Sequence, residues 1–148
     1  MADYARNKKA TFNFDVLEEF EAGIVLYGYE VKAVRGGKVS MVGSYIILRS
    51  GEAWLKGTTI SYFQEANTPD NYNPERERKL LLSKKELKKL EKELNTAGLT
   101  VIPLALYNNG RNIKLKIALA RGKKKADKRE SIKQRDVKRD IDRTLKNQ

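Results

Sequence analysis

The chain has 148 residues and a formal net charge of +12, which predicts one domain with an extension and favours an anionic partner such as nucleic acid over a merely well-solvated basic protein. It contains no Cys and no His, which excludes disulfides, Cys/His zinc sites, and Ser–His or Cys–His catalysis. No apolar run approaches the roughly 20 residues of a membrane span, and the first residues lack a signal-peptide apolar region, so we expect a cytoplasmic protein.

The first predicted element is a long strand over residues 11–29, bent near Ala22–Gly23. It begins with the alternating residues Phe12, Phe14 and Val16, which we expect to face the core. A Gly inside a strand often marks a bulge or a tight bend, which is why we place the bend there.

A helix of one or two turns follows, because the apolar residues within 31–34 have helical spacing, and Gly36–Gly37 ends it. The stretch "RGGKVS" invites comparison with a phosphate-binding loop. That motif needs Gly at position 32 and Ser or Thr at position 39, where this chain has Lys32 and Val39. The two glycines therefore indicate a helix end and not a nucleotide site.

The middle of the chain is rich in strand signals. Residues 44–57 predict two short strands joined by a turn at residues 49–52, and residues 58–63 form a further β-rich run. Residues 64–78 are polar with two prolines, so we predict a flexible surface loop there.

A helix is predicted over residues 84–97. Ser83 stands three residues before Glu86, which is the spacing of a capping box, and Leu82 and Leu87 occupy the positions of a hydrophobic staple. Both features indicate a helix that begins sharply after Ser83.

Residues 99–120 predict a β-hairpin with its turn at Asn109–Gly110, since both residues tolerate positive φ. Pro103 indicates an edge or bulged position in the first strand, because it has no N–H for the ladder. The alternating core-facing residues are Ile102, Leu104 and Leu106 on one strand and Ile113, Leu115, Ile117 and Leu119 on the other.

Together these elements predict a mainly β chain with few helices. We expect a small OB-like antiparallel β-barrel of about six strands, with one long helix before the last hairpin, because closure removes exposed edges in a small domain. The predicted division is a barrel over residues 1–121 and a basic C-terminal tail over residues 122–148.

The tail is the most charged part of the chain. Residues 121–148 hold 12 Lys/Arg and 5 Asp/Glu, a net of 12 − 5 = +7, and their only large apolar residues are Ile132, Val137, Ile141 and Leu145. Such a thin apolar stripe does not offset the conformational entropy lost on ordering. We therefore predict a tail that is disordered alone and helical on an anionic partner, with a helix docked on the barrel as the alternative.

Few residues are candidates for catalysis or metal binding. Glu18, Glu19 and Glu21 are interpreted as the outer face of a strand and not as a metal site, and we predict no catalytic residue, no metal and no cofactor. The stretches "NKKATFNF" and "NYNPERERKLLLSKK" carry basic residues near aromatics or along a surface, which favours phosphate contact over base stacking.

Several motifs taken together resemble the SmpB (SsrA-binding protein) family. They are "FEAGIVLYGYEVK", "RKLLL" and "LARGKKKADKRESIKQRD", and the similarity runs from about Asn7 to Lys146. The resemblance implies an OB-fold barrel that binds the tRNA-like domain of transfer-messenger RNA and works in trans-translation. It also implies a tail that is unstructured in solution and folds as a helix in the decoding centre and the empty mRNA channel of a stalled ribosome.

The resemblance places RNA-binding residues at Asn7, Glu21 and Leu81. Together with their basic and acidic neighbours, the expected RNA-binding residues of the body are Asn7, Lys8, Lys9, Glu21, Glu30, Lys32, Arg35, Arg78, Lys79 and Leu81. The expected ribosome-contacting residues of the tail are Gly122, Lys123, Lys124, Asp127, Lys128, Arg129, Lys133 and Arg135. For Glu21 we expect hydrogen bonds from base or sugar donors, or a role in orienting a neighbouring Lys or Arg.

The function this implies is a non-enzymatic adaptor. Its expected partners are transfer-messenger RNA, the rRNA of the decoding centre and, indirectly, elongation factor Tu, and we expect a monomer. A ribosomal or general single-stranded RNA-binding protein is the alternative. An anionic membrane surface is disfavoured, because the tail's apolar stripe has no Trp or Phe.

Overall fold

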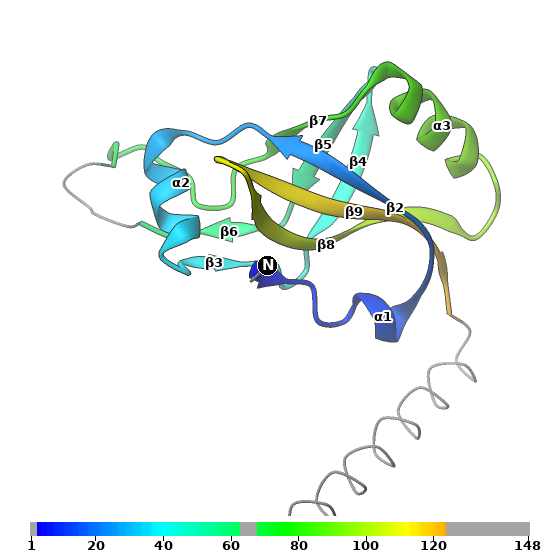
Figure 1. Cartoon of the computed structure of the whole chain (residues 1–148), viewed down its shortest axis with the longest axis horizontal. Coiled ribbons are helices and arrows are strands. Elements are labelled where there is room, and N and C mark those ends of the chain that lie inside the picture. The colour runs from blue at the N-terminus through cyan, green and yellow to red at the C-terminus, as the bar shows by residue number, and fades with distance from the viewer. Residues whose placement is uncertain (1–2, 63–67, 124–148) are drawn as a thin grey trace, which may run out of the picture.

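The computed structural model describes residues 3–62 and 68–123 (Figure 1). The three helices of this part are α1 (Ala10–Asn13), α2 (Gly28–Arg35) and α3 (Lys84–Leu94). Its strands are β1 (Asp3–Arg6), β2 (Phe14–Ile24), β3 (Val39–Ser40), β4 (Tyr45–Arg49), β5 (Glu52–Lys56), β6 (Thr59–Ile60), β7 (Arg78–Leu81), β8 (Leu99–Asn109) and β9 (Asn112–Gly122). The described residues thus form nine strands where the sequence predicts about six, because β1, β3 and β7 are too short to show a recognisable alternation.

The strands form an antiparallel sheet of seven in the order β1-β8-β9-β2-β7-β5-β4, with β3 and β6 as a separate pair. The sheet curls so that β4 contacts β8, and the core lies inside the curl. The mainly β, antiparallel, OB-like architecture that the sequence predicts is confirmed. Fully buried core side chains come from strands far apart in the sequence, such as Leu55, Leu106 and Leu115.

Helix α3 closes one end of this core, with Leu90 fully buried. Its predicted start is confirmed: the Glu86 amide donates to Ser83 Oγ (3.1 Å) and the Ser83 amide donates to Glu86 Oε1 (3.1 Å). The predicted end at residue 97 is wrong by three residues. The last turn tightens into i→i+3 bonds, such as the Asn95 amide to the Lys92 carbonyl (3.3 Å), so the α-helix ends at Leu94.

The predicted strand over residues 11–29 is wrong at both ends. Its first residues form α1, and the strand β2 runs only from Phe14 to Ile24. Phe14 packs against a small core cluster, whereas Val16 is 37% exposed, so the predicted core-facing alternation is wrong at Val16. At Gly23 the strand β2 pairs with Lys114 of β9 on one edge and with Leu81 of β7 on the other.

The hairpin β8–β9 follows the prediction except at its bulge. A register shift between Pro103 and Ala105 confirms the bulge expected at the proline. The extra residue changes the phase of β8, so Leu106 packs in the main core whereas Ile102 packs in a second, smaller cluster. The prediction that Ile102, Leu104 and Leu106 share one face is therefore wrong.

The predicted loop over residues 64–78 is confirmed for residues 68–77, which contain no helix or strand. Thr68 and Tyr72 are nevertheless buried, and strand β7 already begins at Arg78. This segment is held by polar contacts that join residues far apart in the sequence, which local composition does not reveal.

Candidate nucleic-acid interface

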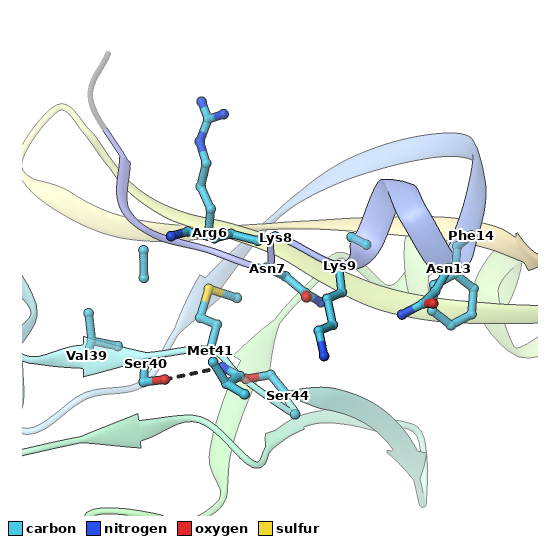
Figure 2. A pocket seen from close by; sticks show the side chains of 14 residues that line it. Arg6, Asn7, Lys8, Lys9, Asn13, Phe14, Val39, Ser40, Met41 and Ser44 are labelled. Atoms are coloured by element: carbon cyan, nitrogen blue, oxygen red, sulfur yellow. Dashed lines mark hydrogen bonds between the residues drawn. The ribbon is translucent and has the colours of Figure 1, made fainter. Parts of the chain in front are cut away.

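A groove of about 670 Å³ lies between the N-terminal segment and the loop before β4 (Figure 2). Residues 5–10 and 13–14 line one wall, and residues 39–44 line the other. We call it the N-terminal groove. It brings together Asn7, Lys8 and Lys9 of the predicted RNA-binding residues and adds Arg6, which the sequence analysis does not single out.

The first wall is held in place by Asn7. Its amide N–H donates to the Leu104 carbonyl (2.8 Å), and its side-chain Nδ2 donates to the Pro103 carbonyl (2.9 Å). These carbonyls are at the bulge of β8, where the regular ladder is interrupted. Asn7 therefore fixes the segment that carries Lys8 and Lys9, both of which are exposed.

The second wall is a tight loop packed on residues 57–58. Ser44 Oγ and Thr58 Oγ1 share a hydrogen bond of 2.7 Å. Gly43 and Gly57 both have φ of +77°, and a Cβ at Gly57 would lie 2.7 Å from the Gly43 carbonyl oxygen. Glycine is thus required at position 57 both by its left-handed backbone and by the close approach of the loop.

The groove combines cationic, hydroxyl and apolar groups. Figure 2 shows Lys9 and Asn13 pointing toward the loop that carries Ser44, whereas Arg6 points away from it. Val42, also on this loop, is 84% exposed. Ammonium groups beside hydroxyls and an exposed apolar side chain suit a nucleotide, whose phosphate takes the cations and whose base takes the apolar surface.

A second hollow is lined by residues of β1, β2, β8 and β9 and contains Glu21. Its carboxylate accepts hydrogen bonds from Tyr107 Oη (2.5 Å) and Asn109 Nδ2 (3.0 Å). The hydrogen bonds from Tyr107 and then Asn109 hold the pKa of Glu21 below its ordinary value. The donors to Glu21 in the structure are thus side chains of the protein, and the expected donors from RNA stay a prediction. Lys116, beside this hollow, pairs with Glu19 at 3.8 Å.

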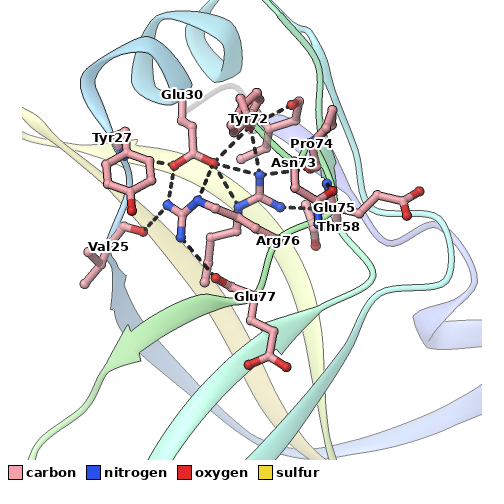
Figure 3. A network of polar contacts seen from close by, with 12 residues as sticks. Val25, Tyr27, Glu30, Thr58, Tyr72, Asn73, Pro74, Glu75, Arg76 and Glu77 are labelled. Atoms are coloured by element: carbon pink, nitrogen blue, oxygen red, sulfur yellow. Dashed lines mark hydrogen bonds and ion pairs between the residues drawn. The ribbon is translucent and has the colours of Figure 1, made fainter. Parts of the chain in front are cut away.

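The predicted residues Glu30 and Arg78 lie in the core instead of on the surface, and both side chains are fully buried. With Tyr72 and Arg76 they form what we call the Glu30 cluster, in which polar contacts converge on the Glu30 carboxylate (Figure 3). The donors to the Glu30 carboxylate are Tyr27 N (2.9 Å), Tyr72 Oη (3.0 Å), Arg76 Nε (3.1 Å) and Nη2, and Arg78 Nε (3.1 Å) and Nη2 (2.7 Å). The prediction that Glu30 and Arg78 contact RNA does not fit this burial, because neither side chain has surface to offer.

Ionisation states in the cluster follow from these contacts. Burial opposes the charged form of Glu30, but hydrogen bonds from Arg76, the Tyr27 amide and Arg78 outweigh it and hold the pKa of Glu30 below its ordinary value. Burial and the Glu30 charge raise the pKa of Tyr72 to about 12, so its hydroxyl remains a donor. At neutral pH the Glu30 carboxylate is therefore charged and the Tyr72 hydroxyl is protonated.

The Glu30 cluster supports the wall of the N-terminal groove. Arg78 Nη1 donates to the Thr58 carbonyl (2.6 Å), and the Thr58 hydroxyl bonds Ser44 in that wall. A chain of polar contacts therefore connects α2 and β7 to the groove. Arg78 thus contacts the groove wall through Thr58 and does not itself line the groove.

The other predicted residues of the body lie at separate places. Lys32 and Arg35 are exposed on α2, and Arg35 Nη2 donates to the Arg111 carbonyl (2.9 Å). Lys79 Nζ lies 3.2 Å from Glu52 Oε1 on the outer face of the sheet. Leu81 is 53% exposed at the end of β7. None of these four lines the N-terminal groove.

Two predicted tail residues belong to the folded body. Gly122 ends β9, and Lys123 donates through its amide to the Asn13 carbonyl (2.9 Å) and through Nζ to the Thr11 carbonyl (2.8 Å). The remaining predicted tail residues lie outside the described residues: Lys124, Asp127, Lys128, Arg129, Lys133 and Arg135. The predicted division between residues 121 and 122 is untested, but the described contacts of the body extend to Lys123.

Sequence reasoning missed the second wall of the groove and two members of the Glu30 cluster, Tyr72 and Arg76. The signal for the wall is the Gly43–Ser44 turn followed by Gly57–Thr58, which only the fold brings together. For Arg78 a signal exists: it stands two residues before the buried Leu80, so strand alternation places both on the inner face.

Within residues 3–62 and 68–123, no three or more acidic side chains gather into a group that could hold a metal ion. Glu18 pairs with Lys89, with 2.6 Å between Oε2 and Nζ, as expected for a solvated outer strand face. No helix in this part of the chain is long and apolar enough to cross a membrane.

The fold and the N-terminal groove define a small basic antiparallel barrel of the nucleic-acid-binding class. A family profile described as "SmpB protein" matches residues 4–147, so the chain belongs to that family. The SsrA-binding protein of Parabacteroides distasonis is 46% identical over 143 residues, which cover 95% of this chain and 92% of that protein. The SsrA-binding protein of Thermosynechococcus vestitus is 44% identical over 142 residues, covering 96% and 93%.

A solved structure agrees with this assignment. A chain described as "tmRNA-SmpB: a journey to the center of the bacterial ribosome" is 39% identical and superposes with a TM-score of 0.66. The match covers 86% of this chain and 92% of that one. Sequence and fold therefore indicate the same family over nearly the whole chain.

Proposed function

We propose that this chain is an RNA-binding adaptor that binds the tRNA-like domain of transfer-messenger RNA and delivers it to stalled ribosomes for trans-translation. The observation that carries the proposal is the N-terminal groove, whose exposed Lys8 and Lys9 are held by Asn7 in a chain of the SmpB family. The relatives named SsrA-binding proteins and the solved chain named for the bacterial ribosome support the same role. The protein acts by binding, without a catalytic residue, metal or cofactor, in the cytoplasm.

Within this role the groove binds phosphates of the RNA and Asn7 sets the position of its cations. Glu21 acts in the second hollow, with its carboxylate already oriented by Tyr107 and Asn109. Lys32, Arg35, Lys79 and Leu81 extend the RNA contact outside the groove. Elongation factor Tu takes part indirectly, through the charged RNA.

The test compares the affinity for a tRNA-like minihelix of transfer-messenger RNA with the affinity for an unrelated RNA at moderate salt. The wild-type chain should prefer the minihelix. The double change Lys8→Gln and Lys9→Gln should weaken minihelix binding about tenfold and reduce the salt slope by about 1–2, since each lost phosphate contact lowers it by about 0.7–0.9.

A matched control removes the same charge elsewhere, with Lys56→Gln and Arg111→Gln. Lys56 is paired to Glu77 (3.2 Å) and neither residue lines the groove. The control should bind the minihelix within about twofold of wild type. Equal wild-type affinities for the two RNAs would favour the alternative of a general RNA-binding protein and reject the adaptor.

The tail has its own test. A chain truncated after Lys123 keeps the contacts of that residue with Thr11 and Asn13. It should keep most of its minihelix affinity and lose tagging of nascent chains on stalled ribosomes, because the tail acts in the decoding centre and mRNA channel. Loss of minihelix binding on truncation would contradict this division between body and tail.

A further inference from the structure

Helix α3 carries a row of lysines that the proposed function does not use. The inner face of the helix is apolar, with Leu90 fully buried and Leu87 and Leu94 packed on the core. The outer face carries Lys85, Lys88, Lys89 and Lys92, all exposed. We call these four residues the α3 stripe. Their spacings of three and four residues place them in one continuous row.

The charges of the stripe are incompletely balanced by the protein. Lys89 pairs with Glu18 on β2, with 2.6 Å between Nζ and Oε2. Among the described residues, no ion pair joins Lys85, Lys88 or Lys92 to an acidic side chain. Glu86 is occupied by the N-terminal cap, where it accepts from the Ser83 amide and hydroxyl.

This arrangement works against the helix itself. Lys85–Lys89 and Lys88–Lys92 are i,i+4 pairs of like charge, which destabilise a helix in isolation. Glutamates at alternate stripe positions would have converted the same pairs into stabilising ones. A polyanion lying along the stripe would remove the repulsion, so the pattern fits a binding surface better than a solvated face.

The stripe is rigid and suits a regular backbone. The capping box, the buried Leu90 and the Lys89–Glu18 pair fix α3 on the barrel, so the backbone that carries the lysines is in place before binding. With a rise of about 1.5 Å per residue, the row extends over about 10 Å in steps of about 5 Å. It contains no aromatic or amide side chain that could read a base. Such a surface recognises phosphates and not sequence.

The stripe and the N-terminal groove lie on different sides of the molecule. In Figure 1, α3 is at the upper right, whereas β3, α1 and the N-terminal strand lie along the bottom. The two surfaces also differ in chemistry, since the groove adds hydroxyl, amide and apolar groups to its cations. A strand of RNA held in the groove therefore leaves the stripe available.

We propose that the α3 stripe is a second RNA-binding surface, which takes the phosphate backbone of a double-helical RNA segment other than the one held in the N-terminal groove. The inference rests on the proposed function only in taking RNA as the polyanion. It assigns α3 a role in holding the protein between two RNA segments.

The test uses the full chain and an RNA duplex of about 16 base pairs with unrelated sequence. The triple change Lys85→Gln, Lys88→Gln and Lys92→Gln removes the three cations without an ion pair, and Gln has a helix propensity close to that of Lys. The slope of log affinity against log salt should fall by about 2–3. Between 50 and 200 mM salt the wild type should then lose about 16- to 64-fold more affinity than the variant.

The matched control loses the same charge from scattered positions, with Lys56→Gln, Arg111→Gln and Arg121→Gln. Its slope should change by less than about 1, because these cations do not lie in one row along a backbone. Residues 124–148 are identical in both variants and do not contribute to the difference. Circular dichroism checks that α3 is retained.

A slope that is equal in the stripe variant and the control would overturn the proposal and leave the stripe as a solvated face. This outcome is separate from failure of the proposed function, which shows as equal wild-type affinity for the minihelix and the unrelated RNA. The experiments therefore distinguish failure of the α3 stripe proposal from failure of the proposed function.

Discussion

The Glu30 cluster and the α3 stripe both concentrate charge, but they do so in opposite environments. In the cluster a fully buried carboxylate accepts hydrogen bonds from two arginines and a tyrosine. In the stripe four exposed lysines share one acidic partner, Glu18. The net charge of +12 includes both kinds of residue, so it does not distinguish cations that stabilise the fold from cations that face a partner.

The physical difference is the cost of removing charge from water. A buried ion is tolerated only where other groups satisfy nearly all its hydrogen bonds, as they do for Glu30. An exposed lysine remains hydrated and contributes little to stability whether or not it is paired. We therefore expect changes in the cluster to alter folding and changes in the stripe to alter binding.

The largest effect should come from Glu30→Gln. The substitution leaves the guanidinium groups of Arg76 and Arg78 next to an amide, and breaking a buried pair by removing one partner costs about 3–5 kcal/mol. Urea unfolding at neutral pH measures the free energy of unfolding.

Glu52→Gln is the control, because it removes a carboxylate from the exposed pair with Lys79 (3.2 Å). It should cost less than about 1 kcal/mol. If Glu30→Gln also lowered the free energy of unfolding by less than about 1 kcal/mol, the Glu30 cluster would contribute no more to stability than a surface ion pair.

The next prediction concerns how the loss of stability in Glu30→Gln depends on pH. The pKa of Glu30 is lowered in the folded state, so its stabilisation is complete above the unfolded carboxyl pKa of about 4.5 and is lost as pH falls through the folded value. The stability gap between wild type and Glu30→Gln should therefore narrow in acid, below about pH 4.5. Urea titrations from neutral pH into acid measure it.

Glu21 and Glu77 also have lowered pKa values, but both remain in the variant, and their contributions cancel in the difference. A gap that stays constant or widens in acid would mean that Glu30 is not stabilised as the charged form.

Local rules predict those parts of the molecule whose contacts are close in sequence. The start of α3 follows from Ser83 and Glu86 within one turn, and the β4–β5 turn follows from Ser50 and Gly51, which have φ of +53° and +73°. The bulge at Pro103 follows from its missing N–H. Each of these is decided by a few neighbouring residues.

The candidate site depends on contacts that local rules do not contain. Glu30 and Arg78 are 48 positions apart, and the "RERK" stretch has the composition of a surface loop. Ser44 and Thr58 meet only because Gly43 and Gly57 allow a close approach of two chain segments. The resemblance to a family predicts RNA contacts at Asn7 and Glu21, but their hydrogen-bond partners become visible only in the structure.

A smaller effect is expected at Gly57, which precedes Thr58, the residue that joins the Glu30 cluster to the groove wall. Gly57→Ala adds a Cβ 2.7 Å from the Gly43 carbonyl oxygen at a φ of +77°. Left-handed backbone alone costs an L-residue about 1–2 kcal/mol, and the clash adds to it. The groove wall must shift, so minihelix affinity should fall together with the urea midpoint.

Gly51→Ala is the matched control, because its φ is +73° and no atom lies within 4 Å of the added Cβ. It should show the conformational cost of about 1–2 kcal/mol and leave minihelix affinity unchanged. Equal losses of stability and affinity in the two variants would mean that the loop–loop contact does not shape the groove.

The smallest expected effect is a change in the stability of the free chain when three lysines of the α3 stripe are neutralised. The triple change Lys85→Gln, Lys88→Gln and Lys92→Gln removes the like-charge i,i+4 pairs, each worth about 0.2–0.5 kcal/mol. The free chain should therefore become slightly more stable in urea at low salt, and the gain should disappear at high salt, where the repulsion is screened. A variant that is more stable alone but weaker on duplex RNA has lost a surface maintained for binding. If the variant is instead less stable than wild type at low salt, the lysines stabilise the fold, and the contrast between stripe and cluster is wrong.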